Sequence, residues 1–413
     1  MPVGRLGRAD RPLHQGVGRS QAVLLLDVAT RAFRNLGDAG IALSPRATVL
    51  TGENGQGKTN FLEACYLACT LRPLRAQKLA ELVRFGSPSA QVAARFLLPG
   101  GARSVEVEIA EGRRVARLDQ KPVRDPDELF GGLAVVAFTP DDLALVKGSP
   151  DGRRRLLDRA VQNRHPGHLA DSRDYLRALK SRNQLLRDKA PAALLEAFDQ
   201  PLARLGALLR LRRQRVLSHL RPHAERAYSE VTRGEVSLGL AYLAAGRDSN
   251  DLGEAAIGME EGDAVAQALL EGRLRAALDA RLPRDRERGF TSVGPHADDL
   301  GLVLGGRSAR LFASQGQARA IVLAFKIGEI ESLRASQGRA PLLLLDDVSS
   351  ELDPERNGFL MRYLAALRGQ VLLTTTDPRL VSAAIEPGKA GDAAGEEPLF
   401  YTVRQGSLTR VER

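Results

Sequence analysis

The feature that most constrains this chain is a glycine-rich loop, GENGQGKTN, which runs from Gly52 to Asn60. A short β-rich segment, RATVLT, precedes the loop, and a segment with apolar residues at helical spacing, TNFLEACYLACTL, follows it. The loop satisfies the pattern G-x-x-x-x-G-K-[ST], whose glycines let backbone N–H groups converge on phosphate oxygens at the start of a helix. The sequence therefore predicts a strand, a phosphate-binding loop and a helix. The residues expected to hold a nucleotide are Gly52, Glu53, Asn54, Gly55, Gln56, Gly57, Lys58 and Thr59.

An apolar strand that ends in acidic residues lies near the other end of the chain, in LLLLDDVSSELD, Leu342 to Asp353. Such a strand delivers a carboxylate to the Mg²⁺ beside nucleotide phosphates, so Asp346 and the hydroxyl of Thr59 are the expected metal ligands. Asp347 follows where a hydrolytic ATPase orients or activates water, and Lys58 would reach the β- and γ-phosphates. Lys58 and Asp347 are therefore the expected catalytic residues. The alternative is that paired acids cap a strand end, which the presence of the glycine loop disfavours.

A third motif, ASQGQARA, places the turn from Ser314 to Gln317 directly before an apolar-periodic helix. A hydroxyl and backbone amides at a helix N-terminus suit a second phosphate-binding surface. In isolation, an ordinary helix cap explains this turn better. Between the other two motifs, it resembles the signature loop of ABC-type ATPases, with Gln315 where Gly is usual. In that class the loop completes the ATP site of a second subunit, so Ser314, Gly316 and Gln317 are expected to reach a partner's γ-phosphate.

The order of the motifs predicts the organisation of the chain. Lys58 and Asp346 stand far apart in sequence, whereas a compact kinase would bring its two motifs closer together. Period-two segments after the loop helix predict a small antiparallel sheet, and the arginine-rich stretch after Asp151 predicts long amphipathic helices. The expected fold class is α/β, an ABC-type P-loop ATPase head with an inserted, mostly helical arm. The expected divisions are a flexible basic leader at 1–20, a head at 21–150 and 286–413, and an arm at 151–285.

The charge of the chain predicts an anionic partner. Sixty Lys and Arg against 50 Asp and Glu give a formal net charge of +10, and nucleic acid is the commonest partner of such a chain. Codon bias toward arginine is the alternative. Aromatic residues are only 4% and Trp is absent, which disfavours base stacking and favours sequence-independent contacts to duplex DNA or a junction. The candidate phosphate contacts, each of which could instead be a solvated helix position, are Arg72, Arg75, Arg153, Arg154 and Arg155.

Two cysteines, Cys65 and Cys69, lie four residues apart in the helix expected after the loop. They cannot build a disulfide framework, so we expect them to pack in the core of a protein kept in a reducing compartment, the cytoplasm. No run of about 18 apolar residues is present, so no membrane association is expected.

Several stretches together resemble the RecF family of ABC/SMC-like ATPases, the recombination mediators of bacteria. Besides the three motifs above, they are FRNL at Phe33, FTPDDLALVKGSPDGRRRLLDRA from Phe138, YLRALKSRNQLLR from Tyr175, and VGPHADDLGLVLGG from Val293. The resemblance implies ATP and Mg²⁺ as cofactors, an ATP-dependent homodimer, and binding to duplex DNA or single/double-strand junctions. It also implies a partnership with RecR and RecO in loading recombinase at single-stranded gaps during replication, repair and the SOS response. SSELD, from Ser349, resembles the segment that lies along the dimer seam.

The chain departs from the general ABC pattern in three places. Asp347 stands where Glu is usual, no Gln occurs between Phe138 and Leu143, and no histidine follows the strand QVLLTTT. Asp141 or Asp142 would have to replace that Gln. These departures predict weak ATP hydrolysis and a long-lived dimer, so the chain is expected to act mainly as an ATP-gated DNA-binding protein. His296, in VGPHADD, has no role implied by the resemblance, and a turn histidine that satisfies backbone groups is at least as good an interpretation.

Three other classes remain as alternatives. A small-molecule P-loop kinase would leave the signature-like turn unexplained, and an ABC transporter subunit would normally carry the missing histidine. Another SMC-like ATPase would need long coiled coils, for which this chain is too short.

Overall fold

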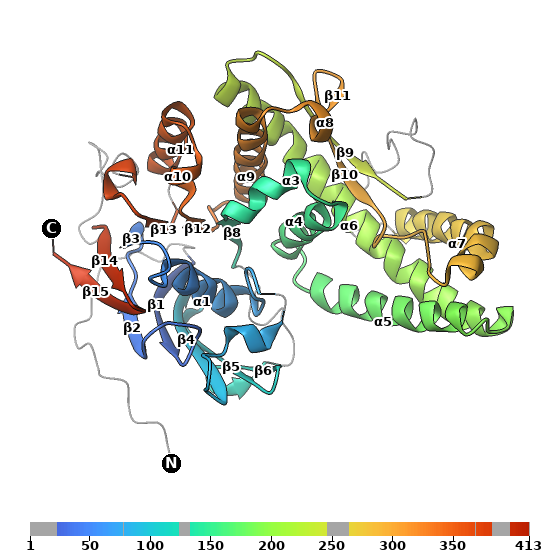
Figure 1. Cartoon of the computed structure of the whole chain (residues 1–413), viewed down its shortest axis with the longest axis horizontal. Helices are drawn as coiled ribbons and strands as arrows, with labels where there is room; N and C mark the ends of the chain where they lie inside the picture. Colours follow the sequence, from blue (N-terminus) through green and yellow to red (C-terminus); the bar gives the residue numbers. More distant parts are fainter. Residues whose placement is uncertain are drawn as a thin grey trace.

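The computed structural model describes residues 23–76, 78–123, 133–245, 264–367, 369–381 and 397–412. The predicted leader at 1–20 lies outside the described residues. Two lobes and a projecting arm are visible in Figure 1. One lobe carries most of the N-terminal strands, and the arm extends away from the head.

The N-terminal lobe is an antiparallel sheet, as the period-two segments predict. Its strand order is β2-β1-β4-β5-β6-β7. Buried Ala90, Val92, Ala94 and Phe96 alternate along β4 with less buried residues such as Gln91, which is the pattern of a sheet with one covered face. The strands are β1 (Leu24–Arg31), β2 (Ala39–Ala42), β4 (Ser89–Leu98), β5 (Gly101–Ala110), β6 (Arg113–Leu118) and β7 (Lys121–Pro122), with the short helix η1 (Leu79–Leu82) beside them.

A second sheet, of mixed direction, carries the motifs. Its strand order is β15-β14-β3-β13-β12-β8, and all neighbours except the β14–β15 pair run parallel. The strands expected before the glycine loop and before the acidic pair are thereby confirmed, with one strand between them. The strands are β3 (Ala47–Thr51), β8 (Val135–Phe138), β12 (Leu342–Asp346), β13 (Val371–Thr375), β14 (Leu399–Arg404) and β15 (Ser407–Val411).

This second sheet separates two hydrophobic cores, because alternate side chains of its strands point to opposite faces. Leu342 and Leu344 of β12 pack in one core with helix α1 (Lys58–Thr70) and the antiparallel sheet. Leu343 and Leu345 pack in the other core with helix α9 (Gln315–Gln337). The run of four leucines therefore reflects a strand buried on both faces. Cys65 and Cys69 of α1 are free thiols buried in the first of these cores, as expected.

The second core draws its elements from distant parts of the chain. A small antiparallel sheet, in the order β11-β10-β9, lies in it together with the helices around α9. The remaining elements of this region are η2 (Pro140–Leu143), α3 (Ala144–Lys147), α4 (Pro150–Gln162), β9 (Leu238–Leu243), β10 (Asp299–Leu304), β11 (Arg307–Ser308), α8 (Ala309–Phe312), α10 (Val348–Glu351), α11 (Pro354–Ala366) and η4 (Pro378–Val381).

The arm is formed by three helices: α5 (His168–Arg187), α6 (Ala192–Thr232) and α7 (Ala264–Arg288). Helix α6 has 41 residues and spans about 60 Å at 1.5 Å per residue. Its first half packs against α5 and α7 through Leu202, Leu205 and Leu209, and its second half packs in the head core from Val216 to Val231. One helix thus belongs to both regions, which ties the arm to the head. The domain bounds stated above remain a prediction. Among the described residues, no helix is both long and apolar enough to cross a membrane.

Candidate nucleotide-binding site

The glycine loop joins β3 to α1 and packs against β14 and the turn between β14 and β15. Its residues Gly52, Gly55 and Gly57 have positive φ, and a Cβ at Gly52 would collide with the carbonyl oxygen of Val403 in β14. The turn between β14 and β15 closes on the loop, because Gly406 N donates to Gln56 O at 2.8 Å and Gln405 N donates to Gln56 Oε1 at 2.7 Å. A Cβ at Gly55, by contrast, would meet nothing within 4 Å. The loop is thus braced on one side and open on the other, where a phosphate chain would fit.

Lys58 begins α1 and folds back over the loop. Its Nζ donates to the carbonyl oxygens of Gly52 at 2.5 Å and Glu53 at 3.0 Å, and the side chain is buried. Burial lowers the pKa of Lys58, and the neighbouring carboxylates of Asp347 and Asp346 partly offset that shift. An ammonium group held by two carbonyls above an open loop can exchange those partners for phosphate oxygens.

Thr59 and Asp346 meet at the head of the sheet, although 287 residues separate them. Thr59 Oγ1 donates to Asp346 Oδ1 at 2.7 Å, and Thr374 Oγ1 of β13 donates to the same oxygen at 3.0 Å. Burial raises the pKa of Asp346, while the two hydroxyls and Arg75 oppose the shift. One hydroxyl and one carboxylate beside an open phosphate loop are a donor set that fits Mg²⁺, whose other ligands would be phosphate oxygens and water.

Arg75 lies beside this carboxylate, which its sequence position did not suggest. Its Nη1 is 3.9 Å from Asp346 Oδ2, and its Nε is 3.5 Å from Asp141 Oδ2. The role of Arg75 as a DNA contact stays a prediction, and its guanidinium lies beside the acids at the nucleotide loop. Of the two acids considered in place of the missing Gln, Asp141 is exposed next to Arg75. Asp142 turns inward, where its carboxylate accepts from Thr139 N and lies 3.4 Å from Lys326 Nζ.

Asp347 occupies a left-handed backbone conformation, with φ of 49°, directly after β12. Its backbone N–H donates to Thr374 Oγ1 at 2.9 Å, and its carboxylate accepts from Ser350 Oγ at 2.7 Å. At the end of β13, where a histidine is usual in ABC heads, Asp377 pairs with Arg379 at 2.8 Å. The side chain of Asp347 is thus oriented by the hydroxyl of Ser350 in α10.

The signature-like turn forms a reciprocal cap at the start of α9. Ser314 Oγ accepts from Gln317 N at 3.2 Å, and Gln317 Oε1 accepts from Ser314 N at 2.9 Å. This capping box agrees with the ordinary-cap interpretation, yet Ser314 is exposed to solvent. Arg356 of α11 lies close to Gly316, since a Cβ there would be 3.5 Å from its Nη1. The turn therefore places an exposed helix N-terminus close to the guanidinium group of Arg356.

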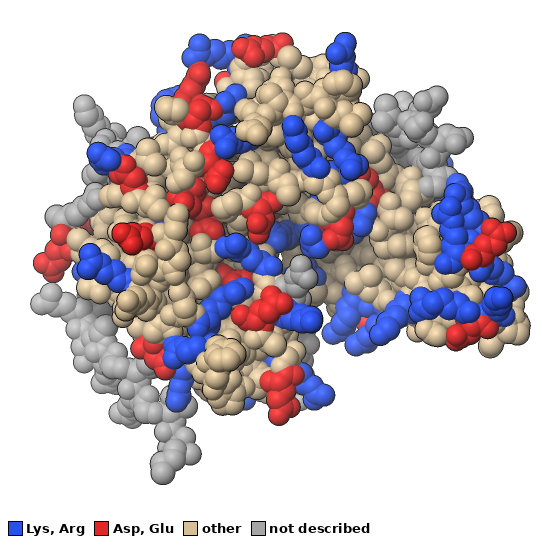
Figure 2. All heavy atoms as spheres, in the orientation of Figure 1, with Lys and Arg blue, Asp and Glu red and all other residues tan. Residues whose placement is uncertain are grey.

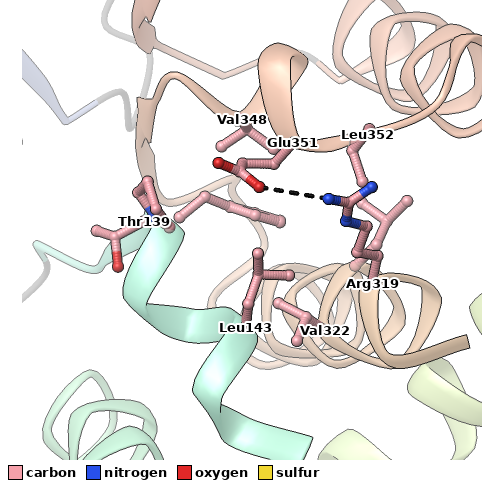
Figure 3. Close-up of a pocket in the computed structure, with 10 residues that line it drawn as sticks. Thr139, Leu143, Arg319, Val322, Val348, Glu351 and Leu352 are labelled. Atoms are coloured by element: carbon pink, nitrogen blue, oxygen red, sulfur yellow. Dashed lines mark ion pairs between the residues drawn. The ribbon is translucent and has the colours of Figure 1, made fainter. Parts of the chain in front are cut away.

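A small apolar pocket lies between η2, α9 and α10 (Figure 3), and it is not the nucleotide site. Leu143, Val322 and Val348 line it, and an ion pair of 3.7 Å between Arg319 and Glu351 crosses its edge. Its volume of about 30 Å³ holds one or two water molecules. The pocket is a packing gap where three segments of the head meet.

The remaining predicted DNA contacts are placed unequally. Arg153 is only 3% exposed, and its guanidinium donates twice to Asp299, at 2.7 and 2.8 Å. This correction removes Arg153 from the residues that present charge to solvent. Arg154 is largely covered and donates to the carbonyl of Asp298, whereas Arg155 is exposed and pairs with Asp151. Arg72 is half-buried beyond α1.

His296 lies in a buried network and contacts none of the nucleotide-site residues. Its Nε2 is 2.9 Å from Thr291 O, and its Nδ1 is 2.7 Å from Tyr175 Oη. Burial lowers the pKa of His296. These contacts match the interpretation of a histidine that satisfies backbone groups. The residues that sequence reasoning missed are Asn35, Thr374 and the 405–406 turn. Of these, only Asn35 belongs to a segment that the sequence had singled out, FRNL. Its Nδ2 donates to Gly55 O of the glycine loop at 3.2 Å.

Comparison with known proteins agrees with this architecture. A model of the RecF/RecN/SMC N-terminal domain matches residues 24–390. The head of an Smc protein, solved with the C-terminal domain of ScpA from Pyrococcus furiosus, superposes with a TM-score of 0.52 at 14% identity, over 94% of this chain and 96% of that one. That likeness concerns the fold alone. The fold and the loop together define an α/β P-loop ATPase head of the ABC/SMC class.

Proteins with higher sequence identity show the family within this class. The protein called DNA replication and repair protein RecF in Anaeromyxobacter sp. (strain K) is 53% identical over 389 residues, covering 93% of this chain and 98% of that protein. Its counterpart in Myxococcus xanthus is 51% identical over 388 residues, covering 93% and 96%. A solved structure described as the recombination mediator protein RecF with ATPrS, in the RecFOR pathway, has a TM-score of 0.80 at 27% identity and covers 96% of this chain and all of that one. The chain belongs to the RecF family.

Proposed function

We propose that this chain is an ATP-gated DNA-binding protein of replication and repair, a recombination mediator that dimerises on ATP and helps load recombinase at single-stranded gaps. The observation that carries the proposal is the contact of Thr59 with Asp346, because it joins the phosphate loop to the acidic strand from the other end of the chain. The relatives named above are replication and repair proteins, and one was solved with an ATP analogue.

ATP and Mg²⁺ are the proposed cofactors. Lys58 and the N–H groups of residues 52–59 would hold the phosphates, and Thr59 with Asp346 would hold the ion. The bound Mg²⁺ would supply charge neutralisation at the β- and γ-phosphates. Arg75 would stay close to that charge, since it already lies beside Asp346.

The proposed dimer follows from the position of the signature-like turn. Among the described residues, no hydrogen bond or ion pair joins Ser314 or Gln317 to the glycine loop of the same chain. A second copy would bring its Ser314, Gly316 and Gln317 to the open side of the loop, and would bring the 349–353 segment to the seam. Two identical half-sites related by a twofold axis would then close together.

Weak hydrolysis is part of the proposal. Asp347 is one methylene shorter than glutamate, and Ser350 already holds its carboxylate. Asp377 pairs with Arg379 where a histidine would be expected to face the phosphate. We therefore expect a turnover number below about 1 per second, at the slow end of the enzyme scale. Faster steady-state phosphate release would contradict a long-lived ATP-bound dimer.

The proposed partners are duplex DNA or a single/double-strand junction, bound without sequence preference, together with RecR and RecO in the cytoplasm. The net charge of +10 supports the DNA part. The solved relatives are described as part of the RecFOR pathway, which supports the protein partners.

Sedimentation of the full chain with ATP, Mg²⁺ and a short duplex tests the proposal. The wild type is expected to dimerise only with ATP. Lys58→Met should lose both ATP binding and dimerisation, while Ser314→Arg should keep ATP binding and lose only the dimer. Lys147→Met, at an exposed lysine, is the matched control. A wild type that stays monomeric under every condition would refute the dimer mechanism.

A further inference from the structure

Helix α5 carries a row of basic side chains on one exposed face. Arg173, Arg177, Lys180 and Arg187 are all exposed, and their spacing of three, four and seven residues places them along one side of the helix. The opposite side of α5 is occupied by the buried residues Tyr175, Leu179, Arg182 and Leu186. At 1.5 Å per residue, the basic row is about 21 Å long.

Acidic neighbours neutralise this row only in part. Arg173 and Arg177 share one carboxylate, that of Asp174, at 3.5 and 3.4 Å. Arg187 bonds to the neutral side chain of Gln184 at 2.8 Å. The row therefore keeps a net positive charge, and two of its arginines hold an anion that a phosphate could replace.

A second group of arginines lies across from the start of α5. Arg114 stands on β6 opposite Ile109, so its side chain emerges at the edge of the sheet face that α1 covers. Burial, and after it the charges of Arg72 and Arg173, hold the pKa of Arg114 below its usual value. Arg72 follows α1, and Arg173 belongs to the arm. Three arginines from three separate segments thus lie near enough to repel one another.

Figure 2 shows how these groups are arranged on the surface. A band of Lys and Arg follows the part of the arm occupied by α5, and more basic side chains lie across a hollow, on the lobe that carries β4, β5 and β6. Repelling cations are costly to gather unless an anion joins them, since like charges raise the free energy of the folded state. A polyanion bound between the two walls would relieve this repulsion.

We infer that the phosphate backbone of duplex DNA lies in this hollow, between Arg114 with Arg72 on one wall and the α5 row of Arg173, Arg177, Lys180 and Arg187 on the other. The inference rests on the DNA binding proposed above. Of the arginines that the sequence suggested as DNA contacts, this site includes only Arg72. A row of cations about 21 Å long on a rigid helix can contact several phosphates of a duplex, which presents one charge per about 1.7 Å of its axis. The row holds no aromatic side chain on which single-stranded bases could stack.

Charge-neutral variants of both walls test the site. Arg173→Gln/Arg177→Gln removes two cations from α5, and Arg114→Gln removes one from β6. The matched controls are Arg95→Gln/Arg117→Gln and the single Arg117→Gln, because both arginines are solvent-accessible on the lobe sheet and pair with acids. Arg117 lies on the same strand as Arg114 but on the outer face. Each full-length protein is titrated with a fluorescent duplex, with ATP, across a range of salt concentrations.

The α5 pair is expected to weaken binding at least about tenfold at about 100 mM salt and to lower the salt slope by about 2, since each lost phosphate contact removes close to one counterion. Arg114→Gln should lower the slope by about 1. The controls should stay within about twofold of the wild type. Melting temperature and ATP affinity should be unchanged in all variants.

Two contrary results have different meanings. If the wild type binds DNA and the variants of either wall behave like their controls, the DNA does not lie in this hollow, and the proposed function stands. If the wild type binds no duplex with or without ATP, both this inference and the proposed DNA binding fail.

Discussion

Two buried aspartates, Asp346 in the head and Asp298 in the arm junction, show how the same side chain is used in two different ways. Both carboxylates are almost inaccessible, at 2% and 0% exposure. Asp298 accepts two hydrogen bonds of 2.8 Å from the guanidinium of Arg210, and further bonds from Tyr242 Oη and Ala245 N. Asp346 accepts from two neutral hydroxyls, and its nearest cation, Arg75, is 3.9 Å away.

The difference is one of charge balance. A buried carboxylate that faces a bidentate arginine is neutralised within the chain and serves the fold. The carboxylate of Asp346 accepts hydrogen bonds only from hydroxyls and has no guanidinium in hydrogen-bonding contact, so its charge is compensated less completely. Burial therefore outweighs these partners and raises the pKa of Asp346. This difference is consistent with the proposed role of Asp346 as a ligand of Mg²⁺. The arm network is therefore expected to respond to mutation through stability, and the head site through ligand binding.

The largest effect is expected from Arg210→Leu. This change leaves Asp298 buried without its cation, and breaking a buried ion pair in this way costs about 3–5 kcal/mol. Urea unfolding of the variant checks the free energy of unfolding. Arg212→Leu is the control, because Arg212 lies on the same helix but pairs with Asp171 at a more accessible site. Equal losses in the two variants would contradict the distinction between the two kinds of aspartate.

Asp346→Asn should abolish ligand binding and leave the free energy of unfolding nearly unchanged, in contrast to Arg210→Leu. The amide still accepts from Thr59 and Thr374 but removes a buried charge, so the nucleotide-free protein should unfold within about 1 kcal/mol of the wild type. Wild type at 100 times the dissociation constant of Mg²⁺-ATP should gain about 2.7 kcal/mol, and the variant should gain none of it. Calorimetry with and without Mg²⁺-ATP measures both quantities. A large loss of stability without nucleotide would show that Asp346 is a structural acid like Asp298.

The smallest effect is a pH dependence of the arm. Burial lowers the pKa of His168, although its Nε2 lies 3.0 Å from Asp158. The unfolded chain therefore takes up a proton as pH falls through about 6.5 while the folded chain does not, and stability should fall with it. His168→Gln should flatten part of the stability change between about pH 7 and pH 5. His296, whose pKa shifts in the same direction, contributes a further part. Unfolding curves at several pH values check this, and an unchanged slope would contradict it.

Asp158, the partner of His168, extends the comparison to lower pH. Burial alone would raise its pKa, but the charge of Arg213 and the hydrogen bonds from His168 and Arg213 outweigh burial and hold the pKa well below its usual value. Its contribution to stability is present above about pH 3.9 and disappears as pH falls further. The corresponding contribution of Asp346 has the opposite sign, because its pKa is raised.

Much of the head could be predicted from sequence because its signals are local. The strand before the glycine loop, the helix after it, the run of four leucines and the period-two segments each follow from a short pattern, and the structure confirms them. The meeting of Thr59 with Asp346 could also be expected, since Thr59 comes shortly after β3 and Asp346 ends β12, and both strands run parallel in one sheet. These inferences need only the periodicity of strands and helices.

The positions of the arginines could not be predicted in the same way. Arg153 and Arg155 are two residues apart, yet one is buried against Asp299 and the other is exposed. Arg75 lies beside Asp346, a proposed metal ligand. The DNA site proposed at the basic row on α5 depends also on Arg114, which is distant in sequence. A long flexible cation finds its partner in three dimensions, so sequence position alone does not determine whether it packs, binds or faces solvent.

By itself, the sequence determined the class of head and the order of its motifs, because glycine spacing and apolar runs act through local backbone geometry. Only the tertiary structure decided which buried charges lie against an arginine of the chain, as Asp298 does, and which lie mainly against hydroxyls, as Asp346 does. Burial makes an unpaired charge costly in free energy. Whether an arginine or a hydroxyl compensates a buried charge depends on contacts between segments far apart in the chain.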